Sequence, residues 1–390
     1  MTDKEIKMPT LARPKVLSWA TDVEENTLDQ AALSAQMPFV PAHIALMPDA
    51  HLGIGATVGS VIPTEGAIMP AAVGVDIGCG MIAALTDLTS HDLGDNLDAL
   101  MPLVTERIPA GVGKGHTDSS DLTALGVHAS EFTAKQDTTA ATQFGTLGSG
   151  NHFVEVCLDD QDRVWTVLHS GSRGIGNQLA QRAITEAKGL MKRYFIDLPD
   201  PDLAYFVEGT PEFDHYITDM LWAQRYAMSS RAKMMDAALA SLFEVVGQGV
   251  EQDRINCHHN FTQKEHHHSR NFWITRKGAI KAATGDRGVI PGSMGTRSYI
   301  VSGLGSTASY TSCSHGAGRR MSRGAARKTL TVESLNTAMA GKSWLSDHAV
   351  DLLDEHPDSY KDIDQVMAAQ ADLVTVDAVL HQVFNYKGVK

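Results

Sequence analysis

The residues best suited to chemistry in this 390-residue chain are Asp, Cys and His beside glycine-rich turns. Asp76 and Cys79 stand three positions apart in Asp-Ile-Gly-Cys, at the end of an expected buried strand over 71–77. A carboxylate and a thiolate at this spacing can point at one ion, and they favour Zn²⁺ or Mn²⁺ over Mg²⁺. Taken alone, the pair fits a buried structural cysteine beside a turn aspartate better.

Two histidines follow the same pattern. Alternation after Gly148-Ser-Gly predicts His152 and Val154 on one strand face, so that His152 could bind metal, unless the segment is only a polar hairpin. His169 ends an expected strand over 164–169 and precedes a glycine turn with Arg173, which is suitable geometry for a phosphate.

The segment Cys257-His258-His259 offers one more imidazole, because adjacent strand residues face opposite ways and only one histidine can reach a given site. We interpret the run 266–268, which is three histidines, as a solvated loop or a substrate contact. The segment 291–295 with Ser298 can hold a base or phosphates, or can simply form a tight turn.

His315 precedes three small residues and two arginines, which would place an imidazole beside a bound phosphate as a nucleophile or a general acid or base. A helix start with an exposed basic face is the structural alternative. No Walker loop occurs in the chain, which disfavours an ordinary P-loop NTPase.

Each group is ambiguous alone, but their joint occurrence is explained by a two-metal phosphoryl-transfer centre.

Helices and strands must bring these residues together in space. We expect helices over 28–36, 177–194 and 216–246, strands over 58–62, 71–77, 164–169 and 379–386, and a polar surface excursion over 111–140. Because the chemical groups come from all along the chain, we predict one domain, 1–390, with a helical excursion near 177–247.

Composition limits the function. The 33 basic and 46 acidic residues give a net charge of -13, which excludes a uniformly basic coat for nucleic acid. No apolar run reaches the ~18 residues that cross a bilayer, and no signal core follows the N-terminus. Four widely spaced cysteines predict a reducing, cytoplasmic setting.

With these residues assembled, the chain resembles the RtcB family of RNA ligases. The resemblance covers nearly the whole chain, in order. It is carried by Met47-Pro-Asp-Ala-His-Leu-Gly-Ile-Gly, Val75-Asp-Ile-Gly-Cys-Gly, Gly148-Ser-Gly-Asn-His-Phe, His169-Ser-Gly-Ser-Arg-Gly, His259-Asn, Ile290-Pro-Gly-Ser-Met-Gly and Ser314-His-Gly-Ala-Gly-Arg.

The resemblance implies an α+β fold, with mixed sheets flanked by helices around a central metal and nucleotide cleft. It implies an enzyme that joins an RNA 3′-phosphate or 2′,3′-cyclic phosphate to a 5′-hydroxyl in RNA repair or tRNA splicing. The co-substrate would be GTP, with two Mn²⁺ ions and a histidine–GMP intermediate. An activating protein partner stays an open question, as do the natural RNA and the oligomeric state.

Carried over by the resemblance, His315 would be the guanylylated nucleophile. The two metal ions would be held by Asp76, Cys79, His152, His169 and His259, with Cys79 bridging. The GMP site would comprise Asn151, His152, Phe153, Val154, Glu155, His259, Asn260, Pro291, Gly292, Ser293, Met294, Ser298, His315, Gly316, Ala317, Gly318 and Lys387. Arg173 and Arg319 would meet RNA or guanylate phosphates. Lys387 is assigned to guanine, with Lys390 as the alternative.

Two basic stretches, 270–281 and 319–328, would supply the RNA groove despite the acidic total charge. Two other functions compete with the ligase. One is a metal-dependent phosphoesterase or cyclic-phosphate hydrolase acting on RNA ends, and the other is a non-catalytic, metal-stabilised RNA-binding protein.

Overall fold

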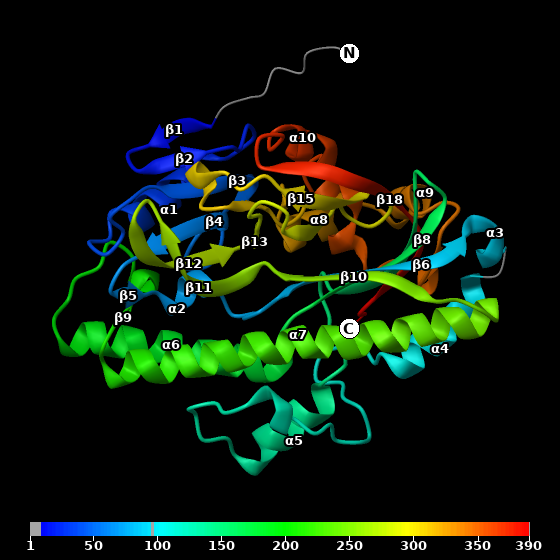
Figure 1. The fold of residues 1–390 in the computed structure, drawn as a ribbon, viewed down its shortest axis with the longest axis horizontal. Coiled ribbons are helices and arrows are strands. Elements are labelled where there is room, and N and C mark those ends of the chain that lie inside the picture. Colours follow the sequence, from blue (N-terminus) through cyan, green and yellow to red (C-terminus); the bar gives the residue numbers. More distant parts are fainter. Residues whose placement is uncertain (1–8, 95–96, 390) are drawn as a thin grey trace.

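The computed structural model describes residues 9–94 and 97–389. Its framework is two large sheets whose central strands are apolar (Figure 1). In the six-stranded sheet the order is β1-β2-β3-β4-β12-β11, with only β2 and β3 parallel. Its strands are β1 (Thr10–Arg13), β2 (Val16–Ser18), β3 (Ile44–His51), β4 (Val58–Thr64), β12 (Arg270–Lys277) and β11 (Asn260–His267).

The second sheet has eight strands in the order β10-β6-β8-β7-β18-β15-β14, and β17 pairs with β18. Its strands are β10 (Glu251–His258), β6 (Gly80–Thr89), β8 (Arg163–Ser170), β7 (Phe153–Asp159), β18 (Val374–Lys387), β15 (Ser298–Gly303), β14 (Arg287–Pro291) and β17 (Ser343–Trp344). The predicted strands over 164–169 and 379–386 lie within β8 and β18. Separate apolar clusters cover the two faces of this sheet, which explains its long buried runs.

Two short two-stranded ribbons lie outside the large sheets. One pairs β13 (Ala279–Lys281) with β16 (Ser312–Ser314), and the other pairs β5 (Ala67–Ile68) with β9 (Phe206–Val207). Because β16 ends at Ser314, the first ribbon places His315 immediately beyond a paired strand.

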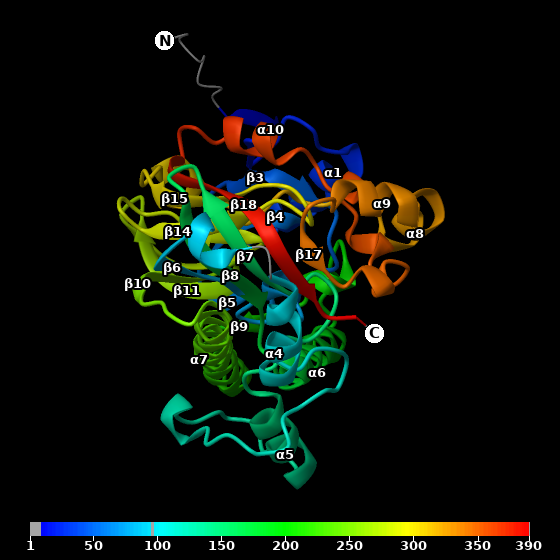
Figure 2. The ribbon, with the colours of Figure 1, turned by 90° about the vertical axis from the view of Figure 1, so that its right-hand side faces the viewer.

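Two long helices, α6 (Arg173–Arg193) and α7 (Pro211–Val246), lie side by side along one face of the sheets (Figures 1 and 2). α7 starts where Thr210 accepts a hydrogen bond from the N–H of Phe213 and ends at Gly247, whose φ is 82°. Both helices confirm the predicted helices over 177–194 and 216–246, but each begins four or five residues earlier. Among the described residues, none of the helices has the length and apolar character needed to span a bilayer.

The remaining helices are short. They are α1 (Glu25–Ala35), α2 (Pro70–Val73), α3 (Ser90–Leu93), α4 (Leu100–Arg107), α5 (Ala134–Gln143), α8 (Arg323–Thr329), α9 (Val332–Ala338) and α10 (Ile363–Ala368). α1 confirms the helix predicted over 28–36. The segment that contains α5 projects away from the body beneath α6 and α7, as predicted for 111–140 (Figure 2).

The strand predicted over 71–77 is wrong. Pro70 occupies the first turn of α2, where proline is favoured, and Gly74 and Gly78 then take φ values of 91° and 71°. The chain therefore turns through 74–79 and enters β6 only at Gly80. The α+β class, with mixed sheets flanked by helices, is confirmed, whereas the single domain 1–390 and its excursion near 177–247 stay predictions.

Candidate metal and guanylate site

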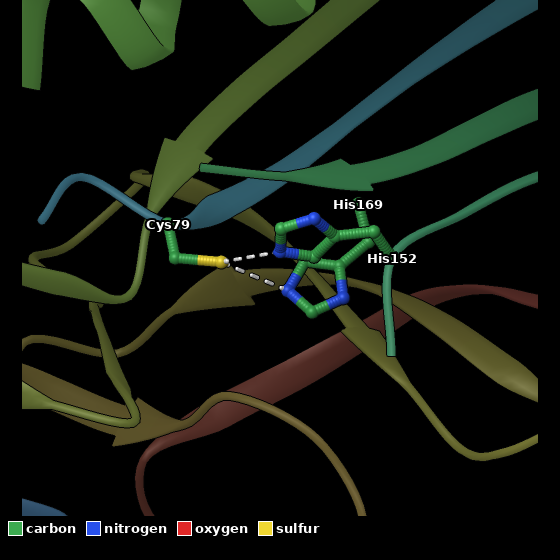
Figure 3. A group of neighbouring side chains, drawn as sticks. All are labelled: Cys79, His152 and His169. Atoms are coloured by element: carbon green, nitrogen blue, oxygen red, sulfur yellow. Dashed lines mark hydrogen bonds between the residues drawn. The ribbon is translucent and has the colours of Figure 1, made fainter. Parts of the chain in front are cut away.

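Three neighbouring strands bring the first metal-ligand candidates together. Cys79 directly precedes β6, His152 directly precedes β7 and His169 lies in β8, which is the strand between β6 and β7. The Cys79 sulfur lies 3.2 Å from Nε2 of His169 and 3.5 Å from Nε2 of His152 (Figure 3). All three side chains are buried, and their ligand atoms fit one metal ion.

The outer nitrogens of both imidazoles are fixed by backbone carbonyls. Nδ1 of His152 lies 3.0 Å from the carbonyl of Leu147, and Nδ1 of His169 lies 3.0 Å from that of Asn151. A carbonyl oxygen only accepts, so each Nδ1 carries a hydrogen and Nε2 is the nitrogen that each ring turns toward Cys79. Metal-binding histidines typically have this arrangement.

Asp76 and His259 extend this group on opposite sides. An oxygen of Asp76 lies 3.1 Å from Nε2 of His152, and Nε2 of His259 lies 3.3 Å from Nε2 of His169. His258 instead donates from Nδ1 to the carbonyl of Gly78 at 2.8 Å. The structure thus brings together the five predicted metal ligands and turns His258 elsewhere.

Burial determines the protonation of this group. It lowers the pKa of His169 and of His259 well below the ordinary value, with neighbouring imidazoles adding to the effect at His259. Burial would raise the pKa of Asp76, but hydrogen bonding and charge from His152, with Arg173, outweigh it and lower that pKa. His169 and His259 are therefore neutral imidazoles beside the Asp76 carboxylate, and both kinds of group are typical ligands of divalent metals.

His315 faces this group from the loop that follows the β13–β16 ribbon. Its ring centroid lies 4.9 Å from that of His259. Nδ1 of His315 lies 2.6 Å from Oδ2 of Asp49, which also accepts from the N–H groups of His315 and Gly316 at 3.1 and 3.3 Å. Asp49 is fully buried in β3. The carboxylate therefore holds Nδ1 and leaves Nε2 as the outward nitrogen.

Sequence reasoning did not assign a role to Asp49. It belongs to the segment Met47-Pro-Asp-Ala-His, which supports the family resemblance but suggests no role for this residue. A lone carboxylate inside a run of buried apolar residues was the available signal, because buried acids in proteins are paired.

A cavity of about 510 Å³ opens between the metal-ligand candidates and His315. Its lining includes most of the predicted site: Asp76, Cys79, Asn151, Phe153, Glu155, His169, His259, Asn260, Pro291, Gly292, Ser293, Met294, His315, Gly316, Ala317, Gly318, Arg319 and Lys387. Four predicted residues do not line it. They are His152, Val154, Arg173 and Ser298.

The four residues outside the lining have different surroundings. Val154 packs into a core cluster and Ser298 is fully buried in β15. The guanidinium of Arg173 lies 3.3 Å from Nδ1 of His152, behind the metal-ligand group. The roles predicted for these residues toward GMP or phosphates stay predictions, and Lys390 lies outside the described residues.

Two buried carboxylates line or border one end of the cavity. Oε1 of Glu155 accepts from the Asn385 amide at 2.7 Å, while Oε2 has no partner among the described residues. Burial raises the pKa of Glu155 to about 8, against the charge of Lys387. Lys387 itself donates to Glu355 at 3.0 Å and lies over the Phe153 ring.

Glu355 is the second residue that sequence reasoning missed. Burial alone would raise its pKa, but Lys387 and Arg323 outweigh burial and lower it to about 2. Glu355 also forms ion pairs with Arg319 and Arg323. No local signal distinguished this acid from others in the acidic tail.

The expected RNA groove over 270–281 is partly wrong. Arg276 is fully buried and forms an ion pair with Glu265, while Lys277 is buried and donates to the carbonyls of Ile54 and Ala71. The second half of β12 is buried on both faces, so its basic side chains cannot form a basic surface. The interpretation of the 266–268 run as a solvated loop is wrong for two of its residues, because His266 and His267 lie in β11. His266 contacts Asn271, and the buried His267 pairs with Glu265.

Comparison with known proteins agrees with this geometry. The family model described as tRNA-splicing ligase RtcB matches residues 30–128 and 123–388. RNA-splicing ligase RtcB of Escherichia coli (strain K12) is 45% identical over 96% of this chain and 97% of that relative. tRNA-splicing ligase RtcB of Methanococcus maripaludis is 29% identical over 88% and 87%, and RNA-splicing ligase RtcB of Mycobacterium tuberculosis is 27% identical over 86% and 94%.

The cavity carries a Cys/His group that could hold a metal ion, and the comparisons show that the protein is an enzyme of the RNA ligase class. The chain belongs to the RtcB family of RNA-splicing ligases.

Proposed function

We propose that this ligase joins RNA 3′-phosphate or 2′,3′-cyclic phosphate ends to 5′-hydroxyl ends through a guanylylated His315. The observation that carries the proposal is the 2.6 Å contact between Asp49 and Nδ1 of His315, beside the metal-ligand group. A carboxylate that accepts from Nδ1–H leaves the Nε2 lone pair available as a nucleophile.

In the first step, Nε2 of His315 attacks the α-phosphate of GTP. A P–N bond forms, the bond to the β-phosphate oxygen breaks, and pyrophosphate leaves. Asp49 stabilises the positive charge that develops on the ring. An oxygen of the RNA 3′-phosphate then displaces His315 from the guanylate. Finally the 5′-hydroxyl attacks the activated 3′-phosphate, and GMP leaves. A cyclic phosphate is first opened by water.

The residues fit a pair of divalent ions. Nε2 of His169 and Nε2 of His259 lie 3.3 Å apart, close enough for both to be ligands of one cation. Asp76, Cys79, His152, His169 and His259 would together hold the two ions. When bound, the ions would neutralise charge on the transferred phosphoryl groups. Mn²⁺ is proposed from the family resemblance.

Guanine is proposed to bind between Phe153 and the buried acidic side chains Glu155 and Glu355. The unpartnered Oε2 of Glu155 can accept from a guanine N–H group, and Lys387 can donate to the guanine carbonyl. A buried acceptor without a hydrogen-bond partner costs free energy, and a ligand that donates to Oε2 of Glu155 removes that cost when it binds. We also propose a reducing, cytoplasmic setting, because all four cysteines are unpaired.

Labelling separates the ligase from its alternatives. Incubation with α-labelled GTP and Mn²⁺ should give a covalent, acid-labile and base-stable label on the wild-type protein, and His315→Ala should lose it. A hydrolase would release 3′-phosphate RNA from a cyclic end without taking label. A binding protein would do neither. Label retained by His315→Ala would refute the proposed nucleophile.

A further inference from the structure

Part of the cavity wall is not used by the proposed guanylate site. This part of the wall comes from the loop after β3, from the turn after α2 and from one face of α6. It includes Ile54, Val75, Gln181, Ile184 and Lys188. A cavity that holds guanylate beside His315 therefore also continues along α6.

The α6 side chains of this lining belong to a longer row. Gln181, Ile184, Lys188 and Lys192 are spaced by three, four and four residues, which places them on one face of the helix. We call them the α6 stripe. Lys188 pairs with Asp202, while Lys192 is exposed and has no ion pair among the described residues. The stripe runs from the cavity, which Gln181, Ile184 and Lys188 line, to Lys192 in the last turn of α6.

Phe195 follows the stripe one turn later and is unusual in two ways. Its side chain is 94% exposed, so packing does not account for an aromatic residue there. Its φ is 54°, and its N–H donates to the carbonyl of Lys192 at the helix end. Glycine is the favoured residue for a left-handed helix terminus, so backbone conformation does not account for phenylalanine either.

We infer that the α6 stripe and Phe195 form a track along which single-stranded RNA leads its 3′-phosphate end into the cavity. Resting on the proposed function, the inference adds the substrate path. Ammonium groups would meet phosphates, and the exposed ring would stack on a base without regard to sequence. From Gln181 to Phe195 the track spans roughly 20 Å at ~1.5 Å per residue, enough for a few nucleotides.

RNA fits this surface better than a protein partner does. The exposed apolar area there is limited to three consecutive side chains, Tyr194, Phe195 and Ile196, and its continuity with the cavity connects it to the substrate phosphates. A second copy of the chain would bury a larger apolar patch than this one.

The test is fluorescence anisotropy with 5′-fluorescein oligouridylates that end in a 3′-phosphate, about 12 and about 3 nucleotides long. Phe195→Ala should weaken binding of the long RNA about tenfold, and Phe195→Trp should restore it. Lys192→Glu should weaken it and lower the salt slope by about one or more. Binding of the short RNA should change little in any variant.

Arg193→Glu is the matched control. It makes the same charge change at the next residue, which lies ~100° around the helix and off the stripe. The inference is overturned if Phe195→Ala binds the long RNA like the wild type, or if Arg193→Glu and Lys192→Glu weaken binding equally. It is also overturned if light scattering shows wild-type self-association that Phe195→Ala abolishes.

GTP labelling keeps the two proposals distinct, because His315 takes up guanylate before RNA is needed. Every track variant should label like the wild type. A wild-type protein that takes no label refutes the proposed function, whereas normal labelling with unchanged RNA affinity in the variants refutes only the track.

Discussion

At the scale of single residues, the orientation of the nucleophile depends on one buried carboxylate. Oδ2 of Asp49 receives three hydrogen bonds from the His315 region, one of them from the ring. This geometry fixes which nitrogen carries the hydrogen. A side chain of the same shape with altered donors therefore tests the positioning without opening a cavity.

Asp49→Asn should slow covalent guanylylation by about 10²- to 10⁴-fold, because the amide can no longer both accept from the ring and stabilise its charge. Rates of label uptake at several pH values measure this effect. The His315→Gln variant serves as the unlabelled reference. Wild-type rates in Asp49→Asn would show that the carboxylate does not orient the nucleophile.

Metal content tests the ligand set. Cys79→Ala should lower metal affinity about 100-fold or more. The reason is that the Cys79 sulfur lies beside both His169 and His152 and is proposed to bind both ions. Elemental analysis after gel filtration measures bound metal, and the thermal midpoint of the metal-free protein reports folding separately. His258→Ala is the matched control for His259→Ala. Full metal content in Cys79→Ala, or loss only in His258→Ala, would contradict the assignment.

At the scale of elements, regular patterns were predictable and turns were not. The helices within α6 and α7 follow from long stretches free of proline with apolar residues at helical spacing. The segment 71–77 has the apolar composition of a strand, yet Pro70 starts a helical turn and Gly74 and Gly78 break the chain direction. Short apolar runs do not distinguish these outcomes, because composition leaves the turn conformation open.

The pairing of β7 with β18 gives a testable pH dependence at Glu155. Its pKa is about 8 in the folded protein and near 4.5 when unfolded. Between these values the folded state holds the extra proton, so this group's contribution to stability falls as pH rises from 4.5 to 8.

Glu155→Gln should remove that fall, which we expect to be on the order of a few kcal/mol. Its thermal midpoint relative to wild type should therefore increase between pH 5 and pH 8, measured without GTP. Asp162→Asn, at an exposed position between β7 and β8 where the side chain has no ion pair among the described residues, serves as the control. Parallel curves for Glu155→Gln and the wild type would contradict the raised pKa.

At the scale of the whole molecule, convergence is the property that local sequence does not encode. Positions 76, 79, 152, 169, 259 and 315 meet because β6, β8 and β7 are neighbours in one sheet and the β13–β16 ribbon directs His315 toward them. The residue types indicated a metal centre, and the family resemblance supplied the set. The contact between Glu355 and Lys387 depends on the fold of the C-terminal region, and the sequence around Glu355 does not indicate it.

The most direct test of the central claim is tandem mass spectrometry of the protein after reaction with GTP and Mn²⁺, under conditions that preserve phosphoramidates. The account predicts one guanylyl group on the peptide that contains His315, bonded to the imidazole, and none on Cys79→Ala. A guanylyl group on a lysine, such as Lys387 or Lys277, or on a different histidine would contradict it.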